Sequence, residues 1–505
     1  MKTKIVRSKA YKNYLLVGFL GGLFAIGISQ LWTLSGRWFI VSVAGIMLIS
    51  LSMVVISQLS DFLTWLLFMC IPLAGFKKLY IPASMKGGIS LFSGTVGIGL
   101  IEFLIIGLYI SWFFEIFIIK SKTLPSFHKM DRLMGLLLGS YIISLLGVAY
   151  IDQGLSTTLY LVEHMLIYFY FSKNLNRRYI RWFMTAVIFT IMLEASMGIL
   201  QSQAGMFQGW ARDKGARSEE LGSQYTVAGI EGFYRADGTM YDSHELGHLL
   251  VLLLPLPFVF MLTNKVSRRY RFICSSAFLL GAIGLAATFS RSGWAGFVPT
   301  IVLTMGIYAL YWREDNAFIA VFICLGVAIV LSPCIIYFVF TRFATAPSEL
   351  VTSRFEQYKT ALQIWRDHPI FGYGAGNYMH ALETYGEAGY SSSLPVHNMP
   401  LWTLVDTGLF GFTIFYLIFL EALRRFWHLI KAHDGIDSFV ALSLFVGLIG
   451  SFVDGLADPS LRGPSVYLVF WLFISLSVAL PRIKREEITH SDQQDDRALD
   501  STGYN

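Results

Sequence analysis

The chain has 505 residues, of which 55% are hydrophobic and only 14% are charged. Soluble globular domains contain about 25% charged residues, so this composition excludes a large soluble protein and predicts an integral membrane protein. The net charge of +6 is small, and no basic stripe interleaved with aromatic residues appears, which argues against nucleic-acid binding. The cysteines form no Cys-x-x-Cys pair, so we expect neither disulfides nor a thiolate metal site.

Membrane spans dominate the expected secondary structure. Apolar runs of about 20 residues, long enough to cross a ~30 Å hydrocarbon core as a helix, occur about fourteen times. The first follows a basic head without a convincing small-residue cleavage site, and we interpret it as a retained signal anchor. The expected spans are residues 14–32, 38–58, 60–76, 91–119, 133–150, 155–172, 182–201, 246–263, 272–289, 292–311, 317–340, 400–423, 437–453 and 465–481.

The distribution of Lys and Arg predicts the orientation. Most of these residues fall in loops that are cytoplasmic if the N-terminus is inside, and three lysines between residues 77 and 86 are the exceptions. We therefore predict an all-α polytopic membrane protein with about 12–14 transmembrane helices and both termini in the cytoplasm. Three polar stretches then face outward, namely residues 202–245, the junction at 290–292, and residues 341–399.

The chain is expected to have three regions. Residues 1–240 form an N-terminal region of membrane helices with an outer loop near 202–245, and residues 241–481 form a membrane core that includes the outer loop 341–399. Residues 482–505 are rich in Asp, Ser and Gln, so they are expected to be a disordered cytoplasmic tail.

Two arginines on the predicted outer face are candidate anion ligands. Arg291 lies between two apolar spans and is either a snorkelling anchor or a ligand; the small residues on both sides, which let a bulky ligand approach, favour a ligand. Arg354 follows Thr352 and Ser353 in a capping-box pattern, which predicts the first turn of an amphipathic surface helix that ends before Pro369. Free backbone N–H groups in a first turn favour an anion, and the alternative is a solvated surface arginine.

His397 is the candidate catalytic base. It lies at the rim of an expected span, beside the amide of Asn398 and on the same predicted face as Arg291 and Arg354. A lone histidine is usually structural, but a neutral imidazole near pH 7 is suited to take a proton from a hydroxyl group. The three glycines between residues 372 and 376 lack the strand and helix of a nucleotide-binding loop, and we interpret them as a flexible turn.

A His-Glu-x-x-His pattern suggests a different enzyme. His244, Glu245 and His248 have the spacing of a zinc metalloprotease, with two ligating histidines and a glutamate base. Asp454 is the best candidate for a third ligand. The alternative is a polar helix start capped at residues 242–243, and on that interpretation His244→Ala is expected to be nearly silent.

Ionisable residues inside the expected spans leave a multi-span transporter as a further alternative. Such side chains often belong to a proton or ion path, but they equally face one another or mark misplaced span ends. They are Glu102, Glu115, Glu163, His164 and Glu194.

Four pieces, in chain order, resemble the O-antigen ligase and polymerase superfamily of bacterial envelope glycan assembly. Together they cover residues 235–411, and their order is more specific than any single piece. In such relatives the His-Glu-x-x-His segment is usually an Asn-containing helix start. The pieces are Arg235-Ala-Asp-Gly-Thr239 with Leu252-Leu-Leu-Pro-Leu256, Ser290-Arg-Ser-Gly-Trp294, Arg354 with Trp365 and His368-Pro-Ile-Phe-Gly-Tyr-Gly374, and His397-Asn398 followed by Gly408-Leu-Phe-Gly411.

The resemblance implies a GT-C-like, metal-independent, inverting glycosyltransferase without a cofactor. The donor would be a glycan on undecaprenyl diphosphate at the outer face of the bacterial plasma membrane. The acceptor would be a saccharide, either lipid A core for a ligase or a lipid-linked repeat unit for a polymerase. Ligases and polymerases share these motifs, so both alternatives stay open. His397 would be the base and Asn398 would orient it or the acceptor. Arg291, Arg354 and Arg235 would meet the charge of the leaving diphosphate.

Overall fold

The computed structural model describes residues 59–74, 99–118, 125–146, 148, 150–204, 226–227, 230–312, 348–386, 396–433 and 435–502. The expected spans 14–32, 38–58 and 317–340 lie outside these residues.

The chain divides into two compact units. The first comprises Met1–Leu66 and Gly107–Lys122, and within it the Ser60 hydroxyl donates to the Glu115 carboxylate at 3.0 Å. The second comprises Leu67–Ile106 and Thr123–Asn505. The boundary predicted near residue 240 falls inside the second unit, which carries all the candidate site residues.

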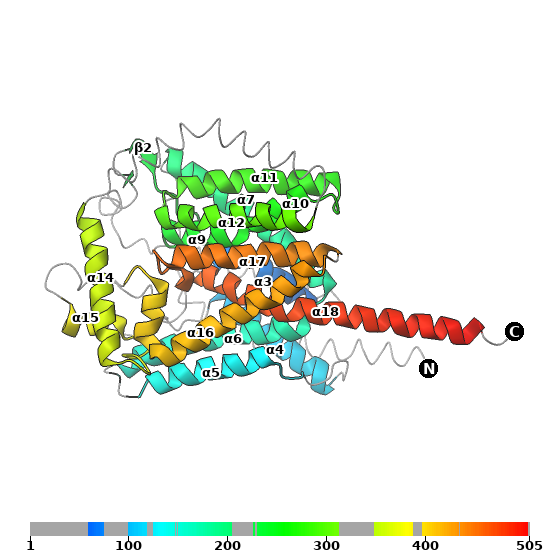
Figure 1. The fold of residues 1–505 in the computed structure, drawn as a ribbon, viewed down its shortest axis with the longest axis horizontal. Coiled ribbons are helices and arrows are strands. Elements are labelled where there is room, and N and C mark those ends of the chain that lie inside the picture. The colour runs from blue at the N-terminus through cyan, green and yellow to red at the C-terminus, as the bar shows by residue number, and fades with distance from the viewer. Residues whose placement is uncertain are drawn as a thin grey trace, which may run out of the picture. The chain divides into compact units, whose positions relative to one another are not determined.

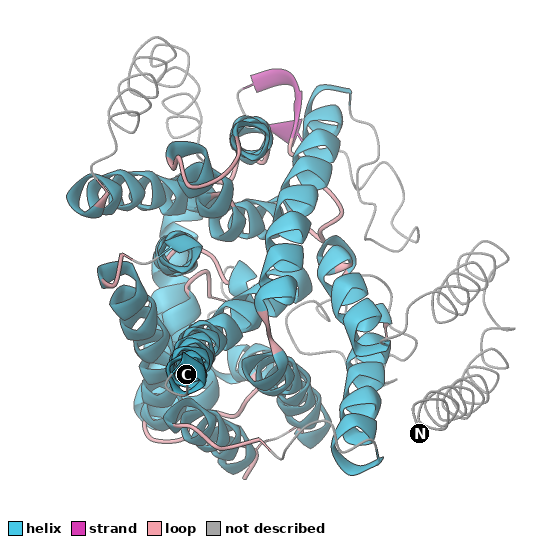
Figure 2. Ribbon diagram, turned by 90° about the vertical axis from the view of Figure 1, so that its right-hand side faces the viewer, coloured by secondary structure: helices cyan, strands magenta, loops and turns pink. Residues whose placement is uncertain are grey.

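The described elements are almost all helices, which confirms the predicted fold class. Eight described segments are long and apolar enough to cross a membrane. A short antiparallel hairpin, β1–β2, contributes the only strands of the described residues and lies beside α7 (Figure 2). The elements are α3 (Leu59–Met69), η1 (Ile71–Leu73), α4 (Leu100–Phe113), η2 (Phe114–Ile118), α5 (Lys129–Ser144), α6 (Ile151–Asn174), α7 (Arg177–Ala204), β1 (Thr226–Val227), β2 (Ile230–Tyr234), α9 (Ser243–Leu253), α10 (Pro255–Leu262), α11 (Arg268–Ala287), α12 (Arg291–Tyr311), α14 (Ser348–Asp367), α15 (Tyr378–Tyr385), α16 (Met399–Lys431), α17 (Gly435–Gly455), η3 (Ser460–Arg462) and α18 (Pro464–Thr502).

The long helices of the second unit form a bundle (Figure 1). α12 packs against α17, α11 against α7, α18 against α6, and α16 against both α5 and α17. The span made by α9 and α10 is apolar on every side from Leu249 to Leu262 and is buried almost throughout. A helix that is hydrophobic all round belongs inside other helices. The bundle is therefore organised around α9, whose first two turns carry the His-Glu-x-x-His segment.

A break in α16 is filled by the glycine-containing loop that precedes α15. Gly408 has φ 62° and ψ −167°, so the helical hydrogen bonds around it are lost. The loop replaces them, because the N–H of Leu409 donates to the Pro369 carbonyl at 2.9 Å and the N–H of Tyr373 donates to the Val405 carbonyl at 2.7 Å. The glycines of this loop, which were interpreted as a flexible turn, are thus held in place by contacts with α16.

Glycine is required where the loop and the break meet. Gly372 has φ 76°, and a Cβ there would stand 2.6 Å from the backbone of Asp406 and Gly408. A Cβ on Gly408 would stand 2.3 Å from the Ile370 carbonyl oxygen. Gly408, the first glycine of the Gly-x-x-Gly motif that ends at Gly411, is therefore required for steric reasons.

α14 lies across one end of the bundle (Figure 1). The helix ends at Asp367, before Pro369 as predicted. It begins at Ser348, however, so the predicted capping box at Ser353 is wrong. Arg354 therefore lies in the second turn of the helix and not in the first. The overlooked signal is Pro347, directly before Ser348, since a proline often marks a helix start. The buried face of α14 includes Gln357, Ala361 and Ile364, whereas Phe355 and Leu362 are exposed.

Three other boundaries differ from the sequence-based expectation. α18 continues as helix through most of the segment expected to be a disordered tail. Ion pairs of Arg482 with Glu486, four residues on, and of Arg177 with Glu487 support this continuation. The expected spans 60–76 and 133–150 are the shorter helices α3 and α5, of 11 and 16 residues.

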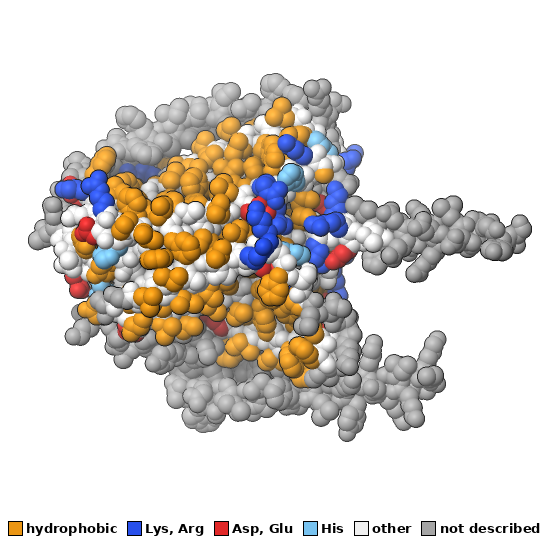
Figure 3. Space-filling model, turned by 60° about the horizontal axis from the view of Figure 1, so that its bottom comes forward, with side chains coloured by type: hydrophobic (Ala, Val, Ile, Leu, Met, Phe, Trp, Pro, Cys, Tyr) orange, Lys and Arg blue, Asp and Glu red, His pale blue; other side chains and the backbone are white. Residues whose placement is uncertain are grey.

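The two ends of the bundle differ in charge. Figure 3 shows Lys and Arg gathered toward the end from which α18 leaves, with a mostly hydrophobic surface over the middle. Arg177, Arg424, Arg425 and Lys431 belong to this basic end. The starts of α9, α12 and α16 lie at the other end, beside α14.

Candidate active site

A tightly held loop between β2 and α9 carries Arg235. The Glu194 carboxylate of α7 accepts hydrogen bonds from the Thr239 N–H at 2.9 Å and from the Thr239 hydroxyl at 2.6 Å. The Gln201 amide accepts from two backbone N–H groups of the loop and donates to the Gly238 carbonyl at 2.8 Å. Glu194, a candidate for an ion path in the sequence, thus anchors the loop that presents Arg235.

Arg235 turns toward the starts of α9 and α12. Its Nε donates to the Thr288 carbonyl at 3.3 Å, and its Nη2 lies 3.1 Å from His244 Nε2. Burial has the largest effect on the pKa of Arg235 and lowers it; the charge of Arg291 lowers it further, and two nearby aspartates raise it. A guanidinium remains charged under such shifts, so Arg235 and Arg291 form two neighbouring positive charges.

Arg291 is the first residue of α12, as the sequence predicted from its position between two spans. The Ser290 hydroxyl caps this helix by accepting from the Gly293 N–H at 3.3 Å. A helix start favours an anion because its N–H groups are unpaired within the helix and its dipole is positive there. Gly293 faces α9, since a Cβ at this position would be in contact with the Gly247 Cα at 3.4 Å.

His397 lies just before α16 and is held by Gln357 of α14. The Gln357 Oε1 atom is 3.1 Å from His397 Nδ1 and 3.3 Å from the His397 backbone nitrogen. A backbone N–H can only donate, so the amide oxygen faces the histidine and Nδ1 carries the proton. The lone pair of the neutral imidazole is then on Nε2. Gln357 is only 2% exposed, so water does not compete for this contact.

Asn398 caps α16. Its Oδ1 accepts from the Leu401 N–H at 2.8 Å, and its Nδ2 donates to the Leu456 carbonyl at the end of α17, also at 2.8 Å. Both ends of the amide are thereby engaged with backbone groups, which fix the chain next to His397. The side chain that orients the imidazole is Gln357, which the sequence analysis did not identify.

The described residues place the candidate base and the candidate arginines at the same end of the bundle. His244 lies within electrostatic range of Arg235, Arg354 and His397. Arg354 precedes Gln357 by three residues, so the two lie on neighbouring positions of one face of α14.

The start of α9 confirms the polar helix start that was the alternative to a zinc site. Asp242 is the cap, and its carboxylate accepts from the N–H groups of His244 and Glu245, both at 2.8 Å. The Glu245 carboxylate in turn accepts from the Tyr241 N–H at 3.2 Å.

The two histidines of this segment have separate surroundings. His244 Nδ1 lies 3.1 Å from the Ser290 Oγ atom. His248 is fully buried one turn deeper, with Nε2 2.6 Å from Ser451 Oγ and Nδ1 3.5 Å from Asp454. Among the residues that the structure describes, no three His, Cys, Asp or Glu side chains are arranged to hold a metal ion.

Other ionisable residues of the spans have local partners. Glu102 accepts from the Gly99 N–H at 2.8 Å, at the start of α4. His164 Nδ1 lies 2.8 Å from the Tyr160 carbonyl of the preceding helical turn. These contacts give each side chain a structural role that does not require transport.

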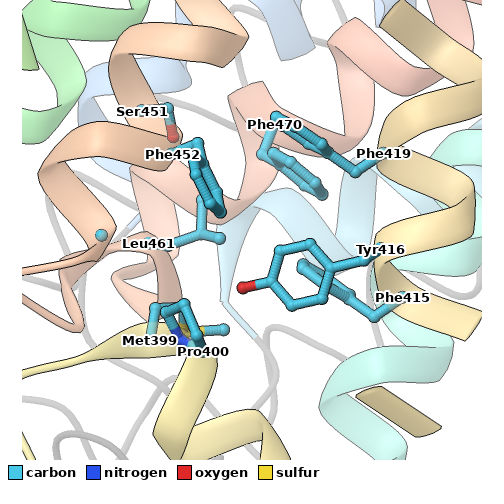
Figure 4. A pocket seen from close by; sticks show the side chains of 10 residues that line it. Met399, Pro400, Phe415, Tyr416, Phe419, Ser451, Phe452, Leu461 and Phe470 are labelled. Atoms are coloured by element: carbon cyan, nitrogen blue, oxygen red, sulfur yellow. The ribbon is translucent and has the colours of Figure 1, made fainter. Parts of the chain in front are cut away.

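An apolar pocket adjoins the first turn of α16. Side chains from α16, α17, η3 and α18 face into it (Figure 4), and it holds about 290 Å³ of empty space, its open side included. Its edge nearest His397 is made by Met399 and Pro400. The lining residues are Met399, Pro400, Phe415, Tyr416, Phe419, Ser451, Phe452, Gly455, Leu461 and Phe470.

Comparison with known families identifies the part of the chain that holds most of this site. Residues 276–416 match the family model described as O-Antigen ligase, a segment that includes Arg291, Arg354 and His397 but not Arg235 or His244. No curated protein matches the chain. Residues 276–416 are therefore similar to the O-antigen ligase family, and the predicted resemblance to the O-antigen ligase and polymerase superfamily is confirmed over this segment.

Proposed function

We propose that the protein transfers a glycan from undecaprenyl diphosphate to a sugar hydroxyl at the outer face of the plasma membrane. The observation that carries this proposal is that His397, Arg235, Arg291 and Arg354 all lie at one end of a membrane bundle, His397 and Arg354 within electrostatic range of His244 and Arg291 within electrostatic range of Arg235. A base and a set of fixed positive charges are the two components that glycosyl transfer from a diphosphate requires.

The arginines have the electrostatic role. Breaking the bond between the anomeric carbon and the diphosphate leaves negative charge on the phosphate oxygens. Arg291 at a helix start and the buried Arg235 stabilise that charge where it develops, and Arg354 approaches from α14. This arrangement is consistent with transfer that needs no metal ion.

His397 has the proton-transfer role. The acceptor oxygen attacks the anomeric carbon as the carbon–oxygen bond to the diphosphate breaks, and the diphosphate leaves with the bonding electron pair. His397 Nε2 takes the proton of the acceptor hydroxyl, because Gln357 holds the ring in the form whose lone pair is on Nε2. A single displacement of this kind inverts the anomeric configuration.

The charge of the two ends supports an outer location of the site. Basic residues such as Arg177, Arg425 and Lys431 lie at the end opposite to α14, and loops rich in Lys and Arg stay in the cytoplasm. Glycans that have been moved across the membrane on a lipid carrier would then meet the site on arrival.

The apolar side chains around the pocket beside Met399 and Pro400 offer a contact surface to the hydrocarbon part of such a donor, although the pocket itself is too small to enclose the chain. It lies two residues from His397 and is lined almost entirely by apolar side chains. The acceptor is a saccharide, either a lipid-linked repeat unit or lipid A core.

The test is transfer by the purified protein in excess EDTA from an undecaprenyl-diphosphate-linked repeat unit, with products measured by mass spectrometry. Elongated lipid-linked products identify a metal-independent polymerase. Products that appear only when lipid A core is added identify a ligase. Absence of transfer in EDTA that zinc restores would overturn the metal-independent mechanism.

A further inference from the structure

His244 contacts one of the proposed diphosphate ligands and is unexplained by the mechanism above. Its Nε2 lies 3.1 Å from Arg235 Nη2, while its Nδ1 lies 3.1 Å from Ser290 Oγ and 3.2 Å from Asp458 Oδ2. Asp458, from the turn between α17 and η3, is only 3% exposed. His244 thus joins α9 to three other segments of the site.

The contacts define the form of the imidazole. An arginine nitrogen can donate a hydrogen bond but cannot accept one, so His244 Nε2 must present its lone pair to Arg235. The proton is then on Nδ1, beside the hydroxyl and carboxylate oxygens that can accept it. His244 is a neutral acceptor for Arg235 and is held in that orientation from its other side.

A fixed guanidinium has an advantage over a mobile one. A free arginine side chain loses conformational entropy when it closes on a phosphate, and contacts that order it beforehand reduce this loss. Arg235 has two such contacts, the Thr288 carbonyl and His244, which approach it from different helices. Together they fix both the position and the plane of the guanidinium.

We propose that His244 is a positioning residue, oriented by Ser290 and Asp458, that holds Arg235 ready for the diphosphate of the lipid-linked donor. This role rests on the proposed function of Arg235. It gives the first histidine of the His-Glu-x-x-His segment a task unrelated to zinc, and it replaces the expectation that His244→Ala is nearly silent.

A double-mutant cycle tests the proposal. Binding of undecaprenyl diphosphate to the purified full-length protein in nanodiscs is measured for the wild type, His244→Ala, Arg235→Ala and the double variant. We expect His244→Ala to raise the Kd about tenfold in the wild-type background and less than about twofold when Arg235 is already absent. His244→Gln, whose amide oxygen can accept from Arg235, is expected to restore part of the affinity.

His248→Gln is the matched control. It changes the other histidine of the segment, whose ring contacts Ser451 and Asp454 and not Arg235. We expect its Kd to remain within about twofold of the wild type, since pairs without shared contacts behave independently. Thermal unfolding of all variants identifies any that fold poorly. If His244→Ala is one of them, the test uses the Kd of His244→Gln with and without Arg235.

The outcomes separate this proposal from the proposed function. An unchanged Kd in Arg235→Ala would show that Arg235 does not bind the diphosphate. A raised Kd in Arg235→Ala with no effect of His244→Ala would leave that function in place and overturn the positioning role. An equal effect of His244→Ala in both backgrounds would also overturn it, as would zinc bound stoichiometrically and lost in both histidine variants.

Discussion

At the scale of single residues, the proposed base and the proposed phosphate ligands are expected to have separable effects. His397→Ala removes the proposed base while Arg235, Arg291 and Arg354 remain. We expect transfer to fall by about 100-fold or more, because general base catalysis contributes that much, with undecaprenyl diphosphate still bound. Binding and single-turnover transfer are measured on the same preparation. Loss of diphosphate affinity in this variant would contradict its role as a base.

Gln357 offers a sharper test of the tautomer. Gln357→Leu keeps the size of the side chain but removes the oxygen that faces His397. We expect kcat to fall about tenfold or more while the KM of the donor changes little, since only proton transfer is affected. The matched control is Gln363→Leu, at an exposed position of the same helix. Equal losses in the two variants would argue against an orienting contact.

The guanidinium of Arg291 is expected to matter beyond its charge. Arg291→Ala removes a cation at the start of α12, and we expect it to weaken donor binding. Arg291→Lys is expected to restore that binding only in part, because an ammonium cannot make the paired, planar hydrogen bonds of an arginine. Donor affinity is measured for both variants. A fully active lysine variant would show that charge alone is sufficient.

At the scale of elements, the joint between the loop 369–373 and α16 is expected to control stability. Gly408→Ala introduces a Cβ 2.3 Å from the Ile370 carbonyl, at a positive φ. We expect a loss of about 1–3 kcal/mol from the backbone conformation alone, measured by thermal unfolding in detergent. Gly306→Ala in α12 is the control, because a Cβ there meets nothing within 4 Å. Equal melting temperatures for the two variants would show that the joint is not under steric constraint.

At the scale of the whole molecule, the orientation of the bundle can be measured directly. Single cysteines are introduced at Lys359 in α14 and at Lys431 at the basic end, in a chain whose four native cysteines are replaced. We expect a membrane-impermeant maleimide to label Lys359→Cys in intact spheroplasts and Lys431→Cys only after permeabilisation. The reverse pattern would place the site in the cytoplasm.

Much of the helical architecture is predictable from one sequence because lipid imposes it. The lengths of the apolar spans and the starts of α12 and α16 can be predicted from local composition. Arg291 and His397 could be chosen as candidates for the same reason, because they lie at those starts. The predicted start of α14 was wrong because the weak capping pattern at Ser353 lies inside the helix, which begins at Ser348, directly after Pro347 in the sequence. The contacts Gln357–His397 and His244–Arg235 were not predictable, since each depends on how two helices cross. The glycines near residue 374 were misjudged because their partner, the break in α16, is more than 30 positions away in the chain.

The break at Gly408 also has a consequence for the height of the proposed site relative to the bilayer. The 23 residues after it are about 34 Å long as a helix, close to the ~30 Å of the hydrocarbon core. The first part of α16 turns away from that direction (Figure 1). In a straight helix, the nine residues of α16 before Gly408 would instead add about 13 Å along that same direction. Under the proposed function, the bend keeps His397 nearer to the level of the headgroups, where the diphosphate of a lipid-linked donor is confined.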